Sequence, residues 1–141
     1  MCASEDRRAV LERRAAEAVL TDESLRRDLP DPAAEVLLAW ALTAVATLAA
    51  QAARRPAGAE EWLADRVGQL RRLLRRLAGL AGRPEPPTPG EWAAIVADLR
   101  ALGLPAPALT AELARRWPAL DPAGRLSILL SWSGPRAEDC L

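Results

Sequence analysis

The densest cluster of chemically functional side chains in this sequence is a set of arginines near its centre. Four of them lie close together: Arg71, Arg72, Arg75 and Arg76. In a helix these side chains share one face and lie about one turn apart, so the phosphates of a polyanion could span them. Arginine is also the only basic residue type in the chain, and the polar face of a buried helix needs solvated groups. We favour this second interpretation and keep the first as an alternative.

Groups for covalent or acid–base catalysis are scarce. The sequence contains no histidine and no lysine, which removes the imidazole base, a common metal ligand and the amine that forms Schiff bases. Two cysteines and five serines remain, without either group to activate them. The adjacent acids Glu60 and Glu61 fit the exposed start of a helix better than a catalytic pair. We therefore predict no catalytic residues, no cofactor and no metal site, and we expect that the protein is not an enzyme.

The distribution of charge limits what the arginines could bind. Nineteen arginines balance nineteen acids over the whole chain, but residues 36–83 carry eight arginines against three acids. Aromatic residues do not alternate with these arginines, which argues against stacking on single-stranded bases. The closing segment is too acidic for a helix that reads duplex DNA. Any contact with nucleic acid is therefore expected to involve its backbone only.

The composition predicts an all-α protein. Alanine and leucine, both strong helix formers, occupy 55 of the 141 positions, whereas valine and isoleucine together occupy eight. Lysine, asparagine, phenylalanine and tyrosine are absent, which is typical of a high-GC bacterial genome because AT-rich codons encode them. Half of the residues are hydrophobic, enough for one core, so we expect a single helical domain over residues 1–141.

The clearest hydrophobic pattern predicts a helix over residues 60–81. Its apolar positions are spaced by four and three residues in turn, as in a helix that packs along another helix. This seam consists of Leu63, Val67, Leu70, Leu74 and Leu77. It could pack inside the monomer or form a surface for a partner or a second copy. The four arginines face away from the seam, so replacing them with glutamine should leave the fold intact. Arg66 falls within the apolar arc, where we expect a structural pairing or a position at the rim.

A long uncharged run predicts an apolar helix over about residues 33–53. Its central 18 residues carry no charge, a length close to that of a membrane span. Eight of them are alanine and three polar side chains interrupt the run, so we expect no membrane span. We expect instead a central bundle helix that neighbours cover on every side. Residues 36–50 should be the most buried part, with Leu42 and Leu48 in the core.

Start and stop signals define the remaining elements and give five to seven helices in total. The other expected helices cover about residues 5–20, 22–29, 89–102, 109–117 and 122–132. Thr21 is expected to cap the second helix, while Thr88 and Glu91 form a capping box for the helix that Gly103 ends. The proline-rich connection 84–89 is a candidate subdomain boundary.

By elimination, the sequence favours a non-enzymatic helical module for protein–protein interaction. It would act as an adaptor or as a self-associating subunit, such as a homodimer, in a larger bacterial assembly. The alternative is an accessory subunit that contacts nucleic-acid backbone through the four arginines, and a third class is a helical enzyme or small-ligand binder. Charged residues stand where a signal peptide would have its apolar core, so we expect a cytoplasmic protein with Cys2 and Cys140 reduced.

Overall fold

The structure is a computed structural model and describes residues 5–27, 29–104, 106 and 111–130. These residues form α-helices and one short 3-10 helix, and no strand occurs among them. The elements are α1 (Glu5–Leu20), α2 (Ser24–Arg27), α3 (Asp31–Ala53), α4 (Ala59–Ala81), α5 (Pro89–Ala101), α6 (Ala111–Arg116), the 3-10 helix (Trp117–Ala119) and α7 (Pro122–Leu130). The all-α helical bundle predicted from composition is confirmed.

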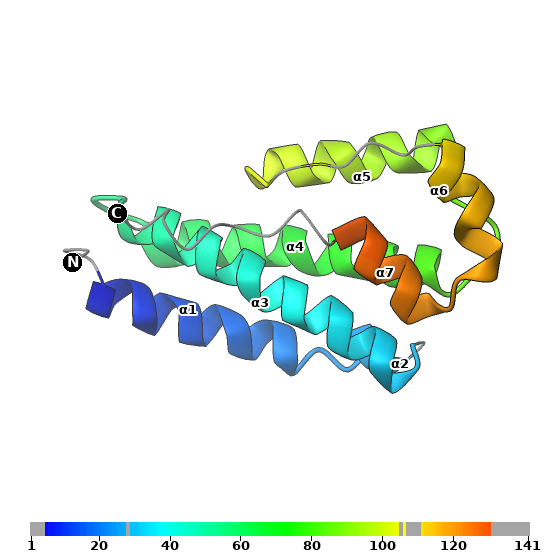
Figure 1. The fold of residues 1–141 in the computed structure, drawn as a ribbon. Coiled ribbons are helices and arrows are strands. Elements are labelled where there is room, and N and C mark those ends of the chain that lie inside the picture. Colours follow the sequence, from blue (N-terminus) through cyan, green and yellow to red (C-terminus); the bar gives the residue numbers. More distant parts are fainter. Residues whose placement is uncertain (1–4, 28, 105, 107–110, 131–141) are drawn as a thin grey trace.

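Three long helices form the body of the bundle (Figure 1). α1 and α3 pack along one another as an antiparallel hairpin, and α4 packs against both. α5 lies along α4 on the side away from α1, and α7 packs on α3 and α4 near the end of α4. α3 packs against α1, α2, α4 and α7 and is a central helix of the bundle, as predicted, and α4 is central as well, with α1, α2, α3, α5 and α7 around it.

The apolar spacing of α4 explains its central position. The predicted helix is confirmed at Ala59–Ala81, and all five residues of the seam are buried against the neighbouring helices. The next row of leucines, which includes Leu73 and Leu80, is buried as well. The seam therefore packs inside one chain. The expectation that it serves a partner or a second copy is wrong for the folded monomer, because its side chains have almost no exposed surface.

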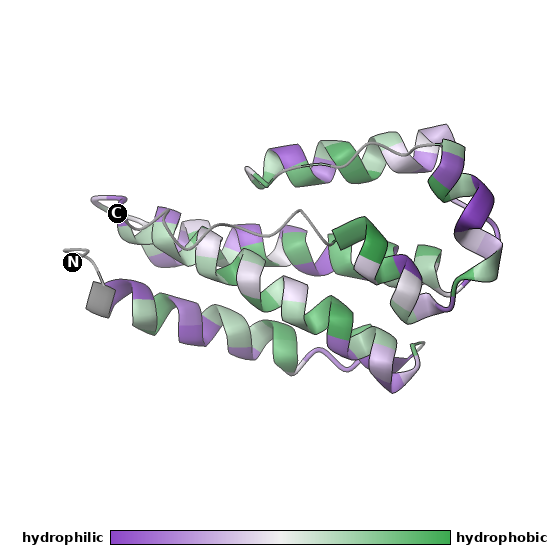
Figure 2. Ribbon diagram, in the orientation of Figure 1, coloured by the Kyte–Doolittle hydropathy of each residue, from purple (hydrophilic) through white to green (hydrophobic). Residues whose placement is uncertain are grey.

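α3 is the predicted apolar helix, but one of its faces is open. Leu48 is fully buried, whereas Leu42 is 36% exposed, and Ala39 and Thr43 are exposed too. Figure 2 shows that strongly hydrophilic residues are absent from the middle of α3, in contrast to α1 and α4. The prediction that neighbours cover this helix on every side, with Leu42 in the core, is wrong, because the packed helices cover only one arc of it.

Local signals at both ends of α5 act as the sequence predicts. The Thr88 hydroxyl accepts a hydrogen bond from the Glu91 backbone N–H at 3.2 Å, and the Glu91 carboxylate accepts one from the Thr88 N–H at 2.9 Å, which completes the capping box. At the other end Gly103 has a φ of 72°. The N–H of Leu104 then donates to the carbonyl of Leu99 at 2.9 Å, which satisfies the last turn of the helix.

α3 also has the length and composition of a membrane-spanning helix, as no other helix in the described ranges has. Within the bundle, 56% of its most apolar window is buried. The core helix of a soluble protein passes the same test, so this finding is weak evidence for a span.

Candidate interaction surfaces

Two of the four clustered arginines of α4 form ion pairs with Asp22. Arg71 Nε donates to Asp22 Oδ2 at 2.8 Å, and Arg75 Nη2 donates to the same oxygen at 3.1 Å. The Asp22 side chain is only 5% exposed, and it also accepts hydrogen bonds from the N–H and the hydroxyl of Ser24 at the start of α2. One buried carboxylate therefore caps α2, fastens it to α4 and orients two guanidinium groups.

These contacts lower the pKa of Asp22 from its ordinary value of 3.8 to about 2. The hydrogen bond from Ser24 favours the charged carboxylate most, and the bonds from Arg71 and Arg75 add to it and outweigh the opposing effect of burial. The prediction that Thr21 caps α2 is wrong. The Thr21 hydroxyl donates to the Glu17 carbonyl at 2.7 Å at the end of α1, which leaves the next residue to face α4.

The other two arginines of the group have different surroundings. Arg76 Nη1 donates to Asp98 Oδ2 at 2.7 Å and so links α4 to α5. Arg72 is exposed and has no hydrogen bond or ion pair with the residues that the structure describes. Acids within the fold thus neutralise most of the expected polyanion face. Three of the four arginines pair with acids outside α4, so we now expect glutamine at all four positions to lower stability, whereas the sequence alone suggested no effect on the fold.

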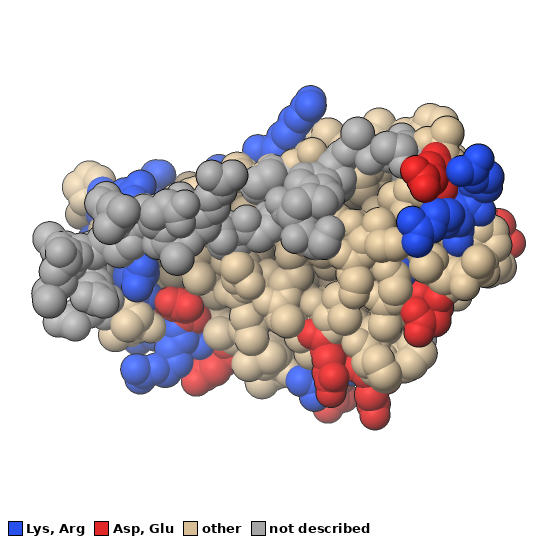
Figure 3. Space-filling model, in the orientation of Figure 1, with Lys and Arg blue, Asp and Glu red and all other residues tan. Residues whose placement is uncertain are grey.

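The open side of α3 forms a nearly uncharged surface. We call it the outer face of α3, and its members are Glu35, Ala39, Leu42, Thr43, Ala46, Thr47 and Ala50. The hydroxyls of Thr43 and Thr47 donate back to helix carbonyls at 2.9 and 3.4 Å, so their polar atoms are satisfied within the helix. Figure 3 shows an uncharged area over the middle of α3, with acidic and basic side chains at both ends of the molecule and along its lower edge.

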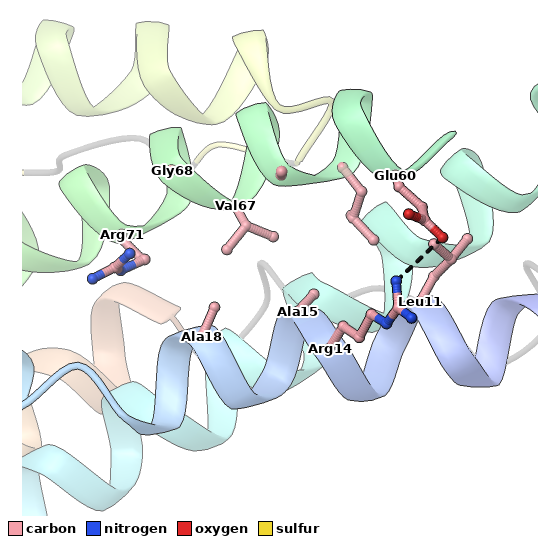
Figure 4. Close-up of a pocket in the computed structure, with 10 residues that line it drawn as sticks. Leu11, Arg14, Ala15, Ala18, Glu60, Val67, Gly68 and Arg71 are labelled. Carbon is pink, nitrogen blue, oxygen red and sulfur yellow. Dashed lines mark ion pairs between the residues drawn. The ribbon is translucent and has the colours of Figure 1, made fainter. Parts of the chain in front are cut away.

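A groove with a volume of about 440 Å³ lies between α1 and α4 (Figure 4). Its floor is apolar and includes Ala15 and Val67, which are both buried. At one end Arg14 Nη1 lies 3.2 Å from Glu60 Oε1. Figure 4 places Arg71 at the opposite end. The groove therefore combines an apolar floor with one neutralised end and one end that carries an arginine.

Arg125 fastens α7 to the end of α4. It is 6% exposed, and among the described residues it has no acidic partner. Its Nε donates to the carbonyl of Trp117 at 3.0 Å, and its Nη1 donates to those of Ala81 and Arg83, both at 2.8 Å. The last two carbonyls lie at the C-terminus of α4, where the helix dipole favours a cation. Sequence reasoning missed this residue, because its position in a short amphipathic helix resembles that of any surface arginine.

The proline-rich connection 84–89 is bridged by an ion pair. Arg83 Nη1 donates to Glu91 Oε2 at 2.8 Å, and a second hydrogen bond joins Arg83 Nη2 to Glu91 Oε1. The bond from Arg83, with that from the Thr88 backbone, lowers the pKa of Glu91 from 4.5 to about 2. Buried apolar residues before and after the connection belong to one cluster. The end of α4 and the start of α5 are therefore joined by both charge and core packing.

Arg66 occupies the rim position expected for it. Its Nη1 donates to the carbonyl of Ala101 at 2.8 Å, beside the end of α5. Its guanidinium carbon lies 5.2 Å from the centre of the Trp62 ring, and Arg55 approaches the same ring at 5.2 Å. A backbone carbonyl and an aromatic face therefore take the place of a carboxylate partner.

The described residues offer little for metal binding or thiol chemistry. In the part of the chain that the structure describes, no three acidic, cysteine or histidine residues lie close enough together to hold a metal ion. Cys2 and Cys140 lie outside the described residues, so their reduced state stays a prediction. The candidate binding surfaces of the described fold are therefore the outer face of α3, the α1–α4 groove and the partly neutralised arginines.

Comparison with known proteins found no matching family model, no similar curated protein and no similar solved structure. The surfaces described above are therefore the features that indicate how the protein could act.

Proposed function

We propose that this chain is a non-enzymatic helical module that associates with a second copy of itself through the outer face of α3. The observation that carries the proposal is the absence of charge from that face beyond Glu35, within an uncharged run of about five helical turns over residues 36–53. Charged residues make up 27% of the chain, and depletion of charge is the compositional mark of an interface core. The apolar seam of α4 is used inside the monomer, whereas the outer face of α3 is a long uncharged helix surface that is open to a partner.

The side chains of the outer face suit close packing against another helix. Alanine and threonine have small side chains, which allow another helix to approach closely. Leu42 projects from this surface as a large apolar side chain that is 36% exposed. The hydroxyls of Thr43 and Thr47 are already bonded to their own helix, so their burial leaves no donor unsatisfied. Two such faces could therefore approach without a large cost of desolvation.

The charges at the ends of the outer face favour an antiparallel pair. Glu35 stands at the N-terminal end and Arg54 follows the C-terminal end, equally far from the midpoint of the uncharged run 36–53 between them. A two-fold axis near Ala46 places the acidic end of each copy against the basic end of the other. The dipoles of the two α3 helices would then also oppose one another favourably. A parallel pair would bring like charges together.

The size of the surface predicts weak association. A helix of 23 residues is about 35 Å long at 1.5 Å per residue and about 10 Å wide. Its face is smaller than the roughly 800 Å² per partner that is typical of stable complexes. We therefore expect a dimer whose population rises with protein concentration.

Light scattering measures this association directly. The mass should rise from 15.2 kDa towards twice that value as concentration increases. Ala39→Glu puts a charge on the outer face and should keep the protein monomeric, whereas Ala97→Glu, at an exposed alanine of α5, should dimerise like the original chain. A constant mass of 15.2 kDa up to about 1 mM would reject the proposal.

Cross-linking tests the orientation of the pair. The experiment uses a chain in which Cys2 and Cys140 are replaced by serine, with one new cysteine on the outer face. Ala46→Cys lies near the expected axis and should form an intermolecular disulfide, which needs Cα atoms within about 7 Å. Ala39→Cys lies far from its own copy in an antiparallel pair and should not cross-link. Equal cross-linking at both positions would contradict the antiparallel arrangement.

A further inference from the structure

The groove between α1 and α4 has the size and lining of a small-ligand site. Its volume of about 440 Å³ falls in the range of roughly 300–1,000 Å³ found for ligand pockets. The side chains of Leu11, Leu63 and Val67 on its floor are buried and apolar. Glu60 and Arg71 mark its ends on α4, so it runs for roughly 16 Å at 1.5 Å per residue. This shape suits a narrow, extended apolar group.

The end of the groove at Arg71 carries an excess of positive charge. Asp22 supplies one negative charge to two arginines, Arg71 and Arg75. Arg71 uses Nε for Asp22, and its two terminal nitrogens make no hydrogen bond with the described residues. Because the buried carboxylate already orients the guanidinium, the binding of an anion there costs little side-chain entropy. At the other end, Arg14 and Glu60 cancel each other.

Gly68 has no side chain and therefore leaves space in the groove beside α4. Glycine is the least favourable residue in a helix interior after proline, yet Gly68 lies in the middle of α4. A Cβ atom at this position would meet no heavy atom within 4 Å, so no packing within the chain requires glycine. A larger side chain here would instead take up space in the groove.

We infer that this groove binds a single-chain amphipathic anion, whose alkyl chain lies on the apolar floor and whose carboxylate accepts hydrogen bonds from the terminal nitrogens of Arg71. The charge of Arg71 selects the head group, and the width of the groove beside Gly68 admits the chain. The site is on α1 and α4, away from the outer face of α3, so it stands or falls independently of self-association.

Titration of the full-length protein with dodecanoate, below its micelle concentration, tests the inference. Amide chemical shifts should change in a saturable way at Ala15, Ala18 and Gly68. Dodecanol, which has the same chain without the charge, should bind about tenfold more weakly because it loses one charge-assisted hydrogen bond. Dodecylammonium should bind more weakly still. Saturable shifts confined to the outer face of α3 would overturn the proposed location.

Paired variants separate the groove from general effects on the fold. Gly68→Leu should lower the affinity for dodecanoate at least about tenfold by occupying the groove, whereas Gly79→Leu, at another open glycine of α4, should leave it unchanged. Arg71→Gln should remove the preference for dodecanoate over dodecanol. Arg75→Gln breaks the other bond to Asp22 without lining the groove and should keep that preference. Thermal melting confirms that each variant is folded.

Two results would overturn the inference. The first is a lack of saturable dodecanoate binding by the original chain, and the second is equal affinity in Gly68→Leu and Gly79→Leu. If Gly68→Leu blocks binding but Arg71→Gln leaves the head-group preference unchanged, the assignment of the carboxylate to Arg71 is wrong.

Discussion

Asp22 and Arg71 are 49 positions apart in the chain and are joined by a hydrogen bond of 2.8 Å between Oδ2 and Nε. The bond connects the corner between α1 and α2 to the middle of α4. Arg75 donates to the same oxygen, so a single carboxylate sets the geometry of one end of the groove. The two arginines therefore stabilise the packing of the bundle whether or not a ligand is bound.

Replacing Asp22 tests this role through the dependence of stability on pH. Asp22→Asn should lower the free energy of unfolding by about 1 to 2 kcal/mol at neutral pH. The pKa of Asp22 is about 2 in the folded chain, below the ordinary value of 3.8. The stabilisation is therefore complete above about pH 4 and is lost as the pH falls to about 2. Urea denaturation at several pH values measures the difference between the two proteins.

The matched control for this experiment is Asp65→Asn, at an exposed acid of α4. Its effect should be small at every pH, since Gln69 can still donate to the new amide oxygen. If Asp22→Asn costs as much at pH 2 as at pH 7, the charge of Asp22 is not what stabilises the fold.

The two leucines of α3 that the sequence places in the core should respond differently to truncation. Leu48→Ala should cost roughly 2 to 5 kcal/mol because it removes a fully buried side chain and leaves a cavity. Leu42→Ala should cost less than about 1 kcal/mol in the monomer, since Leu42 is partly exposed. Urea denaturation at low protein concentration compares them. Similar losses for both variants would mean that the outer face of α3 is covered in the monomer.

Removing Arg125 should be among the more destabilising changes in α7. Arg125→Met leaves the carbonyls of Trp117, Ala81 and Arg83 without their charged donor, and we expect a loss of about 3 kcal/mol. Arg116→Met, at an exposed arginine of α6, should change stability by less than about 0.5 kcal/mol. Denaturation followed by circular dichroism distinguishes them, and equal effects would show that the buried contacts contribute little.

Alanine at two glycines should shift stability in opposite directions. Gly68→Ala should stabilise the protein by about 0.5 to 1 kcal/mol, because the new methyl group meets no neighbour and alanine favours the helix. Gly103→Ala should destabilise it by about 1 kcal/mol, because a φ of 72° strains any residue with a Cβ atom. The melting temperature of Gly68→Ala should be higher than that of the original chain, and the melting temperature of Gly103→Ala should be lower.

Nucleic-acid binding through the arginine group is expected to be absent at physiological salt. Arg71, Arg75 and Arg76 are paired with acids of the fold, and at about 0.15 M salt the remaining charge is screened beyond about 8 Å. Fluorescence anisotropy with a labelled oligonucleotide measures this. Tight, salt-dependent binding that Arg72→Gln weakens would contradict the expectation and support the accessory-subunit alternative.

The helices were predictable from sequence because their signals are local. The spacing of leucines defines α4, and Thr88 and Gly103 define the ends of α5. The open face of α3 was not predictable, since a helix that is apolar on all sides carries no periodic signal for which side is covered. The partners of the arginines were also beyond sequence reasoning, because Asp22 and Asp98 come from distant segments. Arg125 gave no local sign that its three acceptors lie in other elements.

The order of the helices along the chain has a consequence for biosynthesis. α3 is complete at Ala53, but α7, which packs on it, ends 77 positions later at Leu130. At roughly 5 to 20 residues per second, a ribosome needs about 4 to 15 s to make that segment. During this interval the nascent chain carries a helix with an uncharged run of 18 residues, with more of its surface open than in the finished bundle. Until α7 has been made, the part of the α3 surface that α7 covers in the finished bundle has no partner from that helix.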